Sequence, residues 1–305
     1  MSSDNRGGNW IVVGMLASLL AVASCGQGGE SGEADPSARD NADAMSREHA
    51  DDTGTPGPGA SVAPERAVVA ETLPYAEVDD ELVYGHFVFP SDMVEPLPAL
   101  IVIHEWWGLN EGLRAMADRL AGEGYIVLAV DLFGGKTAQY PPDARVLMLE
   151  VLENPEPANE NLRQAYQFVN ETAGAPRIGV LGWCFGGGWA LNAAMLMPEA
   201  LDATVIYYGE VTSDQDKLAP IDMPILGLFA EDDRGIPVDS VRGFEQTLKA
   251  LGKNHEIVVY PGVGHAFANP SGNNYDPQVA QMAWEKTLAF LDDHLGPGTA
   301  DAPGR

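Results

Sequence analysis

The chain has 305 residues, 45% of them hydrophobic, which is enough for one core. A core of about 200 to 250 residues with non-core tails fits this length, so we expect one catalytic-size domain. The 45 acidic and 17 basic side chains give a formal charge of -28. That charge would repel a phosphate backbone, so we expect no nucleic-acid partner.

The first 25 residues have the pattern of a targeting segment. Arg6 supplies a weakly basic start, and Trp10 to Ala23 form an apolar run. The run is shorter than the roughly 18 residues that a membrane span needs, so it predicts the core of a signal peptide. It ends in Val-Ala-Ser-Cys at Cys25, which resembles the lipobox of bacterial lipoproteins.

In such lipoproteins the cysteine is lipidated and becomes the mature N-terminus. We therefore predict an exported, membrane-anchored lipoprotein on the periplasmic or cell-surface side, with a signal peptide at 1–25 and lipidation at Cys25. The alternatives are an uncleaved anchor, or an ordinary signal peptide with a chance cysteine.

The next segment, residues 26–66, contains almost no aromatic or branched apolar side chains. That composition buries too little surface to offset chain entropy, so we predict a disordered acidic tether. His49 lies within it and is expected to be solvated. We also predict a disordered tail at 298–305.

Residues 67–297 alternate between short apolar runs and amphipathic stretches. The apolar runs predict strands buried on both faces, after one outer antiparallel strand of period two. The predicted strands are 81–89, 98–106, 125–133, 177–183, 203–209, 224–230 and 256–262. The predicted helices are 111–122, 143–153, 158–172, 187–197, 239–251 and 277–295. This alternation predicts an α/β domain whose mostly parallel central sheet has helices on both faces.

The loop after the strand at 177–183 carries Gly182-Trp183-Cys184-Phe185-Gly186, which has the form of a nucleophile elbow. Glycines two residues before and after the nucleophile give the turn the clearance it needs. The amides at the start of the following helix favour a thiolate on Cys184. The alternative is a packed, inert cysteine beside a glycine-rich strand exit.

Two later strand ends supply the other groups of an acyl-transfer site. The loop 230–237 offers Asp232 or Asp233 to orient a histidine, although three adjacent acids could also form a solvated loop or a weak calcium site. The loop 260–267 offers His265 as a general base, the alternative being a surface histidine. The order cysteine, acid, histidine is that of α/β hydrolases.

The sequence HEWWGLN at 104–110 ends the first central strand. A helical zinc-protease motif would need a second histidine at Gly108, so that reading fails. In an acyl-transfer site this loop would offer the backbone amide of Trp106 to an oxyanion hole, together with the amide of Phe185. We expect no metal and no organic cofactor.

These segments, with DLFGG at 131–135 and GHAF at 264–267, resemble the dienelactone hydrolase family, cysteine-dependent enzymes of the α/β-hydrolase fold that open enol lactones. The resemblance covers about residues 75 to 295. It implies Cys184, Asp233 and His265 as the catalytic triad, with Asp233 preferred over Asp232 by its distance from the following proline. It also implies that Glu105 holds the resting thiol until substrate binds.

Two positions depart from the family. An arginine that binds the substrate carboxylate in well-studied members is Asn269 here. Arg145 could match a second such arginine, but Leu149 then replaces its tyrosine partner. We therefore assign Asn269 and Arg145 to substrate binding and expect a weakened preference for anionic substrates.

The function predicted is a cysteine-dependent hydrolase of lactones or small carboxylic esters, acting through a thioester acyl-enzyme. We expect a monomer whose partners are a small-molecule substrate and a membrane, the latter through the lipid anchor. The alternative function is an anchored protein that binds small apolar ligands in a vestigial site. Redox chemistry of the thiol ranks last, because no resolving cysteine is evident.

Overall fold

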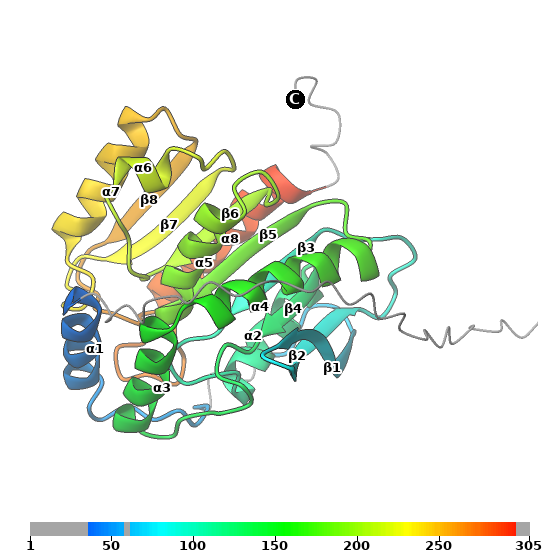
Figure 1. Ribbon diagram of the computed structural model, residues 1–305, viewed down its shortest axis with the longest axis horizontal. Coiled ribbons are helices and arrows are strands. Elements are labelled where there is room, and N and C mark those ends of the chain that lie inside the picture. Colours follow the sequence, from blue (N-terminus) through cyan, green and yellow to red (C-terminus); the bar gives the residue numbers. More distant parts are fainter. Residues whose placement is uncertain (1–35, 58–61, 297–305) are drawn as a thin grey trace, which may run out of the picture. The chain divides into compact units, whose positions relative to one another are not determined.

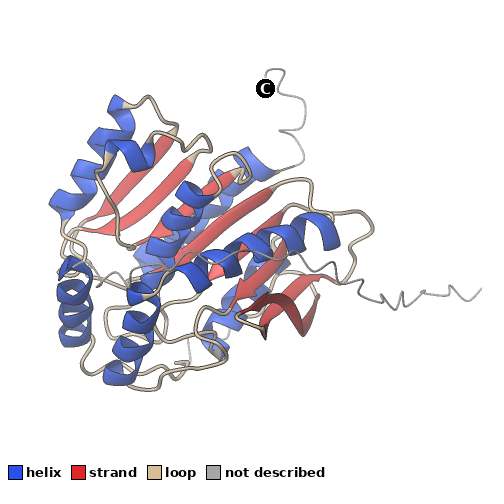
Figure 2. Cartoon of the chain, in the orientation of Figure 1, coloured by secondary structure: helices blue, strands red, loops and turns tan. Residues whose placement is uncertain are grey.

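A computed structural model of the chain describes residues 36–57 and 62–296. An eight-stranded sheet lies at its centre in the order β1-β2-β4-β3-β5-β6-β7-β8, shown in red in Figure 2. The strands are β1 (Val68–Val78), β2 (Glu81–Pro90), β3 (Ala99–Ile103), β4 (Ile126–Val130), β5 (Ile178–Trp183), β6 (Ala203–Tyr207), β7 (Ile225–Ala230) and β8 (His255–Tyr260). Strands β3 to β8 are parallel, and β1 and β2 are antiparallel.

Helices cover both faces of this sheet. The helices in the described residues are α1 (Pro36–Glu48), α2 (Glu111–Gly122), α3 (Pro141–Glu153), α4 (Glu156–Gln167), α5 (Phe185–Leu196), α6 (Gln215–Leu218), α7 (Val238–Ala250) and α8 (Pro277–Leu295). Helices α4, α5 and α7 lie in front of the sheet in Figure 1, and α2 and α8 lie behind it. The predicted mostly parallel sheet with helices on both faces is confirmed.

The sequence accounts for these elements locally. Every side chain of β3, β4 and β6 is buried, as the continuous apolar runs predict. Asn110 caps α2 by accepting a hydrogen bond from the N–H of Leu113 at 3.0 Å. Asp276 caps α8 in the same way, and Pro277 follows at the first helical position. These caps fix where the two helices begin.

The loops that carry the predicted site all leave the carboxyl ends of parallel strands. HEWWGLN follows β3, Cys184 follows β5, the loop of Asp233 follows β7 and the loop of His265 follows β8. Because these ends share one edge of the sheet, the four loops meet there.

The structure contradicts the predicted tether for residues 36–57. Residues 36–48 form α1, which packs beside α3 (Figure 1). An ion pair between Arg39 and Glu153, at 2.6 Å, joins the two helices. His49 is 3% exposed rather than solvated. Composition alone missed this segment, because its order depends on a few side chains that pack against the rest of the domain.

The signal peptide, Cys25 and the tail at 298–305 lie outside the described residues. Within the described part of the chain, no helix has the length and apolar character that crossing a bilayer requires.

Candidate active site

Cys184 stands on a strained turn between β5 and α5. Its φ of 57° and ψ of −119° lie outside the regions that non-glycine residues prefer. A side chain at Gly186 would place its Cβ 2.3 Å from the carbonyl oxygen of Ile103, and one at Gly182 would meet Gly186 at 2.1 Å. Glycine is therefore required on both sides of the cysteine, and a backbone conformation of this kind costs about 1–3 kcal/mol.

Other strained residues lie at the same place. Outside the β1–β2 turn, the described non-glycine residues with positive φ are Cys184, Tyr208 and Ala266. Tyr208 directly follows β6, and Ala266 directly follows His265. Because strained backbone clusters at functional sites, this distribution identifies the sheet edge around Cys184 as the candidate site.

His265 and Asp233 form a buried pair at this edge. Nδ1 of His265 lies 2.7 Å from Oδ2 of Asp233, and each side chain is 1% exposed. Oδ1 of Asp233 accepts hydrogen bonds from the backbone N–H groups of Gly235 and Ile236, at 2.9 and 2.8 Å. Asp232, the other acid considered, is exposed. The structure thus brings Asp233, and not Asp232, to the histidine.

The other ring nitrogen of His265 faces a different environment. Nε2 is buried and has no nitrogen or oxygen partner among the described residues. Burial on its own would lower the pKa of His265, but the charges of Asp233 and Cys184 outweigh it and hold that pKa well above its usual range. The histidine is therefore held between a carboxylate on one side and the thiol on the other.

Glu105 lies beside this group without a hydrogen bond to the thiol. Its Oε2 accepts a hydrogen bond from Nδ2 of Asn269 at 2.6 Å. Burial raises the pKa of Glu105 to about 7, and the charge of Asp52 adds to the rise, whereas the charge of His265, the hydrogen bond from Asn269 and the nearby Tyr208 oppose it. Glu105 is consequently poised between its neutral and charged forms near neutral pH.

The two predicted oxyanion-hole amides lie in different elements. Phe185 is the first residue of α5, so its N–H belongs to the helical amides that have no partner inside the helix. Trp106 lies in the loop after β3. That loop is fixed by His104, whose Nδ1 donates to the carbonyl of Glu105 at 2.7 Å while Nε2 accepts from the N–H of Leu132 at 3.0 Å.

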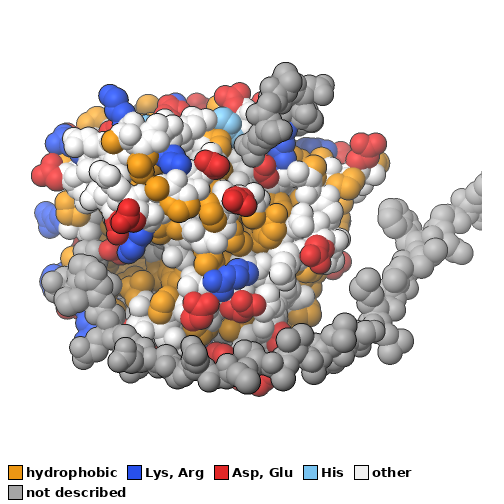
Figure 3. All heavy atoms as spheres, turned by 45° about the horizontal axis from the view of Figure 1, so that its top comes forward, with side chains coloured by type: hydrophobic (Ala, Val, Ile, Leu, Met, Phe, Trp, Pro, Cys, Tyr) orange, Lys and Arg blue, Asp and Glu red, His pale blue; other side chains and the backbone are white. Residues whose placement is uncertain are grey.

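A cavity of about 460 Å³ opens onto Cys184 and His265. Most of its lining side chains are hydrophobic, and the polar ones include Asn192, Glu210 and Lys217. The full lining is Ala42, Met45, Met148, Leu152, Pro155, Cys184, Phe185, Gly188, Trp189, Leu191, Asn192, Tyr208, Glu210, Val211, Thr212, Lys217, Ile236 and His265. Figure 3 shows apolar side chains gathered around a hollow on one face of the molecule.

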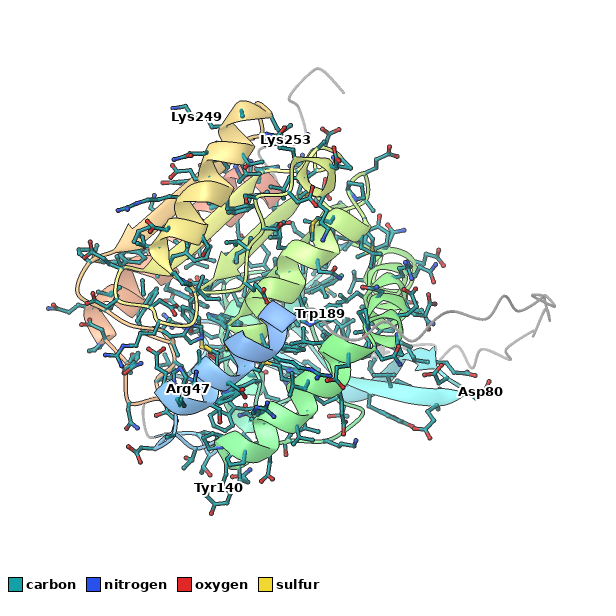
Figure 4. All side chains as sticks on the ribbon, turned by 60° about the vertical axis from the view of Figure 1, so that its left-hand side comes forward. Arg47, Asp80, Tyr140, Trp189, Lys249 and Lys253 are labelled. Atoms are coloured by element: carbon teal, nitrogen blue, oxygen red, sulfur yellow. The ribbon has the colours of Figure 1, made fainter. Side chains whose placement is uncertain are left out.

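Helix α1 supplies one wall of this cavity. Ala42 and Met45 face the pocket from α1, opposite residues of α5 that include Trp189. Figure 4 shows α1 crossing in front of α5, with Trp189 near one end of it. A segment predicted to be a tether is therefore part of the candidate site.

A model of the dienelactone hydrolase family matches residues 84–295. The chain belongs to the dienelactone hydrolase family. A relative from Aquifex aeolicus, named "Putative carboxymethylenebutenolidase", is 35% identical over 205 residues, which cover 65% of this chain and 89% of that protein. A relative of the same name from Escherichia coli is 29% identical over 248 residues, covering 76% of this chain and 90% of that protein.

The fold comparison agrees with the family match. The crystal structure named "Putative Dienelactone Hydrolase" from Klebsiella pneumoniae superposes with a TM-score of 0.68 and 27% identity, covering 75% of this chain and all of that one. The predicted α/β-hydrolase fold, the predicted family and the prediction of a carboxylic ester hydrolase are confirmed.

The two positions that depart from the dienelactone hydrolase pattern have different environments. Asn269 binds Glu105 and lies at the site. Arg145 does not line the cavity, because its Nε pairs with Oδ1 of Asp43 on α1 at 2.5 Å. In the structure Arg145 joins α3 to α1, and its assignment to substrate binding stays a prediction.

The sequence reasoning missed two residues of this dienelactone hydrolase site. The ring of Tyr208 lies 5.1 Å from that of His265, and the ring of His49 lies 5.3 Å from it. Tyr208 could have been found from its place directly after a buried strand. Nothing in the local sequence around His49 indicates that it would reach the site.

Proposed function

We propose that this member of the dienelactone hydrolase family is a cysteine-dependent hydrolase of carboxylic esters or lactones that acts through a thioester. The thiolate of Cys184 attacks the substrate carbonyl carbon, and the backbone amides of Trp106 and Phe185 stabilise the oxyanion. His265, oriented by Asp233, gives its proton to the leaving oxygen. Water then hydrolyses the thioester and releases the acid.

The observation that carries this proposal is the arrangement of the three side chains. Cys184 occupies a strained elbow that opens into an apolar cavity, and His265 interacts with both it and Asp233. A raised histidine pKa beside a thiol favours the ion pair of thiolate and imidazolium that a cysteine nucleophile needs. An inert core cysteine would need neither the strain nor the glycine clearance.

We infer a substrate whose acyl part is largely apolar. The cavity walls are formed by side chains such as Met148, Leu152 and Trp189, which suit aliphatic or aromatic groups. Asn269 carries no charge to bind a carboxylate, and Arg145 is paired elsewhere. Neutral esters and lactones should therefore be hydrolysed at least as well as anionic ones.

We further propose that Glu105 controls the resting thiol. Asn269 donates a hydrogen bond to it, and its pKa of about 7 lets it take up or release a proton near neutral pH. Tyr208 interacts with both Glu105 and Cys184, which connects the carboxyl group to the thiol.

Ester turnover by variants tests the proposed mechanism. Release of p-nitrophenol from esters of increasing acyl length, with and without a terminal carboxylate, would be measured for the parent chain, Cys184→Ala and His265→Ala. Both variants should lose at least about 10²-fold in kcat/KM. Full activity in either would refute the mechanism, and an inactive parent chain that binds the esters would favour a vestigial binding site instead.

Reactivity of the thiol provides an independent check. Iodoacetamide should label Cys184 rapidly, and His265→Ala should slow the labelling, because the histidine favours the thiolate. Slow labelling at a rate that His265→Ala leaves unchanged would contradict an active nucleophile.

We also propose that the protein is anchored through a lipid on Cys25. The support is the sequence Val-Ala-Ser-Cys after an apolar run. Cys25→Ala should move the protein from the membrane fraction to the released fraction of producing cells. Membrane association that survives this substitution would argue against lipidation.

A further inference from the structure

The segment that follows α1 places a second His–Asp pair in the site. His49 and Asp52 are 3% and 7% exposed, and Nδ1 of His49 lies 2.7 Å from Oδ2 of Asp52. The distance between His265 and Asp233 is also 2.7 Å. Two neighbouring histidines are therefore each paired through Nδ1 with an aspartate at the same distance.

Asp52 is held as firmly as a carboxylate that orients a base. Its Oδ1 accepts a hydrogen bond from the backbone N–H of Asn273 at 3.0 Å. Burial raises the pKa of Asp52, but the hydrogen bonds and charge of its partners outweigh that effect and leave the pKa below its usual value. Asp52 is thus ionised near neutral pH, so Nδ1 of His49 donates to it; in a neutral imidazole with that tautomer, Nε2 is the lone-pair acceptor.

That acceptor is unused by the described residues. Nε2 of His49 is buried and has no hydrogen-bond partner among them. The ring lies 5.3 Å from the ring of His265 and 6.0 Å from that of Trp106, centroid to centroid. A buried acceptor without a partner costs about 1–3 kcal/mol, so its presence beside the thiol site calls for a functional explanation.

We propose that His49, oriented by Asp52, is a catalytic base that deprotonates the water in the hydrolysis of the thioester. This inference rests on the proposed thioester mechanism. A base with a free Nε2 next to His265 can hold the attacking water while His265 and Cys184 complete the first half of the reaction.

The step balances as follows. The water oxygen bonds to the thioester carbonyl carbon as its proton passes to Nε2 of His49. The carbon–sulfur bond then breaks, Cys184 leaves as a thiolate, and the product is a carboxylic acid. The product acid ionises into solvent, and the proton on His49 passes to His265, which restores the thiolate–imidazolium pair.

The two halves of the reaction can be separated with p-nitrophenyl butyrate. Release of p-nitrophenol in the first turnover measures acylation, and the steady-state rate includes deacylation. Intact-mass measurement after acid quenching measures the fraction of Cys184 that carries the butyryl group.

His49→Gln should reduce the steady-state rate by roughly 10²-fold, because general-base catalysis contributes about that much or more. The first-turnover rate should stay within about threefold of the parent value, and the butyryl thioester should accumulate to nearly one per chain. Asp52→Asn should shift both measurements in the same direction and provides the second variant if His49→Gln does not fold. Added imidazole should restore turnover to His49→Ala.

Arg47→Ala is the matched control, because Arg47 is an exposed residue of α1, two positions before His49 (labelled in Figure 4). It should leave both rates and the thioester fraction unchanged. The proposal is overturned if His49→Gln turns over at the parent rate, or if it loses both rates equally without accumulating thioester. If Cys184→Ala still hydrolyses the ester, the thioester mechanism itself has failed. That result can be told apart from a failure of the His49 proposal, because it appears in the Cys184 variant and not in the His49 variants.

Discussion

Replacement of Glu105 by glutamine should change how the stability of the protein depends on pH. In the folded protein the pKa of Glu105 is about 7, against 4.5 for a glutamate in water. The folded state thus keeps a proton that the unfolded state releases, and such a group loses stability as pH rises between the two values. Glutamine, which is neutral throughout, cannot show this loss.

The size of the effect follows from the two pKa values. Each pKa unit corresponds to about 1.4 kcal/mol. The free energy of unfolding of the parent chain, relative to that of Glu105→Gln, should therefore fall by about 3 kcal/mol between pH 4.5 and pH 7. The amide can still accept the hydrogen bond from Asn269, so the main change is the loss of the charge. Above pH 7 the difference should level off.

Urea unfolding followed by tryptophan fluorescence at pH 5, 6, 7 and 8 measures this difference. The curves of the parent chain and Glu105→Gln should diverge as pH rises from 5 to 7. Glu231→Gln, which changes an exposed acid, is the control and should run parallel to the parent. Parallel curves for Glu105→Gln as well would refute the assignment of a raised pKa to Glu105.

Three further substitutions test the geometry. Asp233→Asn should lower kcat for p-nitrophenyl esters by about 10²-fold or more. The reason is that an amide cannot both accept hydrogen bonds from two backbone N–H groups and orient His265. Asp232→Asn, the control, should have little effect. Gly186→Ala should destabilise the fold by about 3 kcal/mol in urea unfolding, since its Cβ would overlap the end of β3; an unchanged midpoint would contradict the elbow geometry. Arg145→Ala should lower the free energy of unfolding by at most about 1 kcal/mol, because it removes one partly exposed ion pair. It should leave the ratio of kcat/KM for anionic and neutral esters unchanged. A lower ratio would show that the arginine does bind the substrate carboxylate.

The sequence was sufficient for the sheet and for the loops at its carboxyl edge. The buried strand β5 is a continuous apolar run, and Cys184 directly follows it. Strand β8 is mostly half-buried, but the glycine-containing loop after it carries His265. The antiparallel strand β1 was missed, because most of its side chains are exposed or half-buried and its apolar pattern is weak. Its position depends on pairing with β2.

The leading segment could not be predicted for a different physical reason. Helix α1 has little apolar surface of its own, and its fully described buried residues, Ala42 and Met45, are covered by parts of the chain far from them in sequence. The role of Arg145 was missed for the same reason, since its partner Asp43 lies on α1. Local composition carries no information about such long-range contacts.

The position of α1 along the chain has a consequence for how specificity can change. The family match begins at Tyr84, so Ala42 and Met45, which form one wall of the cavity, precede the region that defines the family. Substitutions or exchanges in this leading segment can reshape the acyl pocket without altering the sheet, the elbow or the loops at its edge. The same segment carries His49 and Asp52, so changes in it can alter both one wall of the pocket and the proposed hydrolysis step while the sheet, the elbow and the loops at its edge stay unchanged.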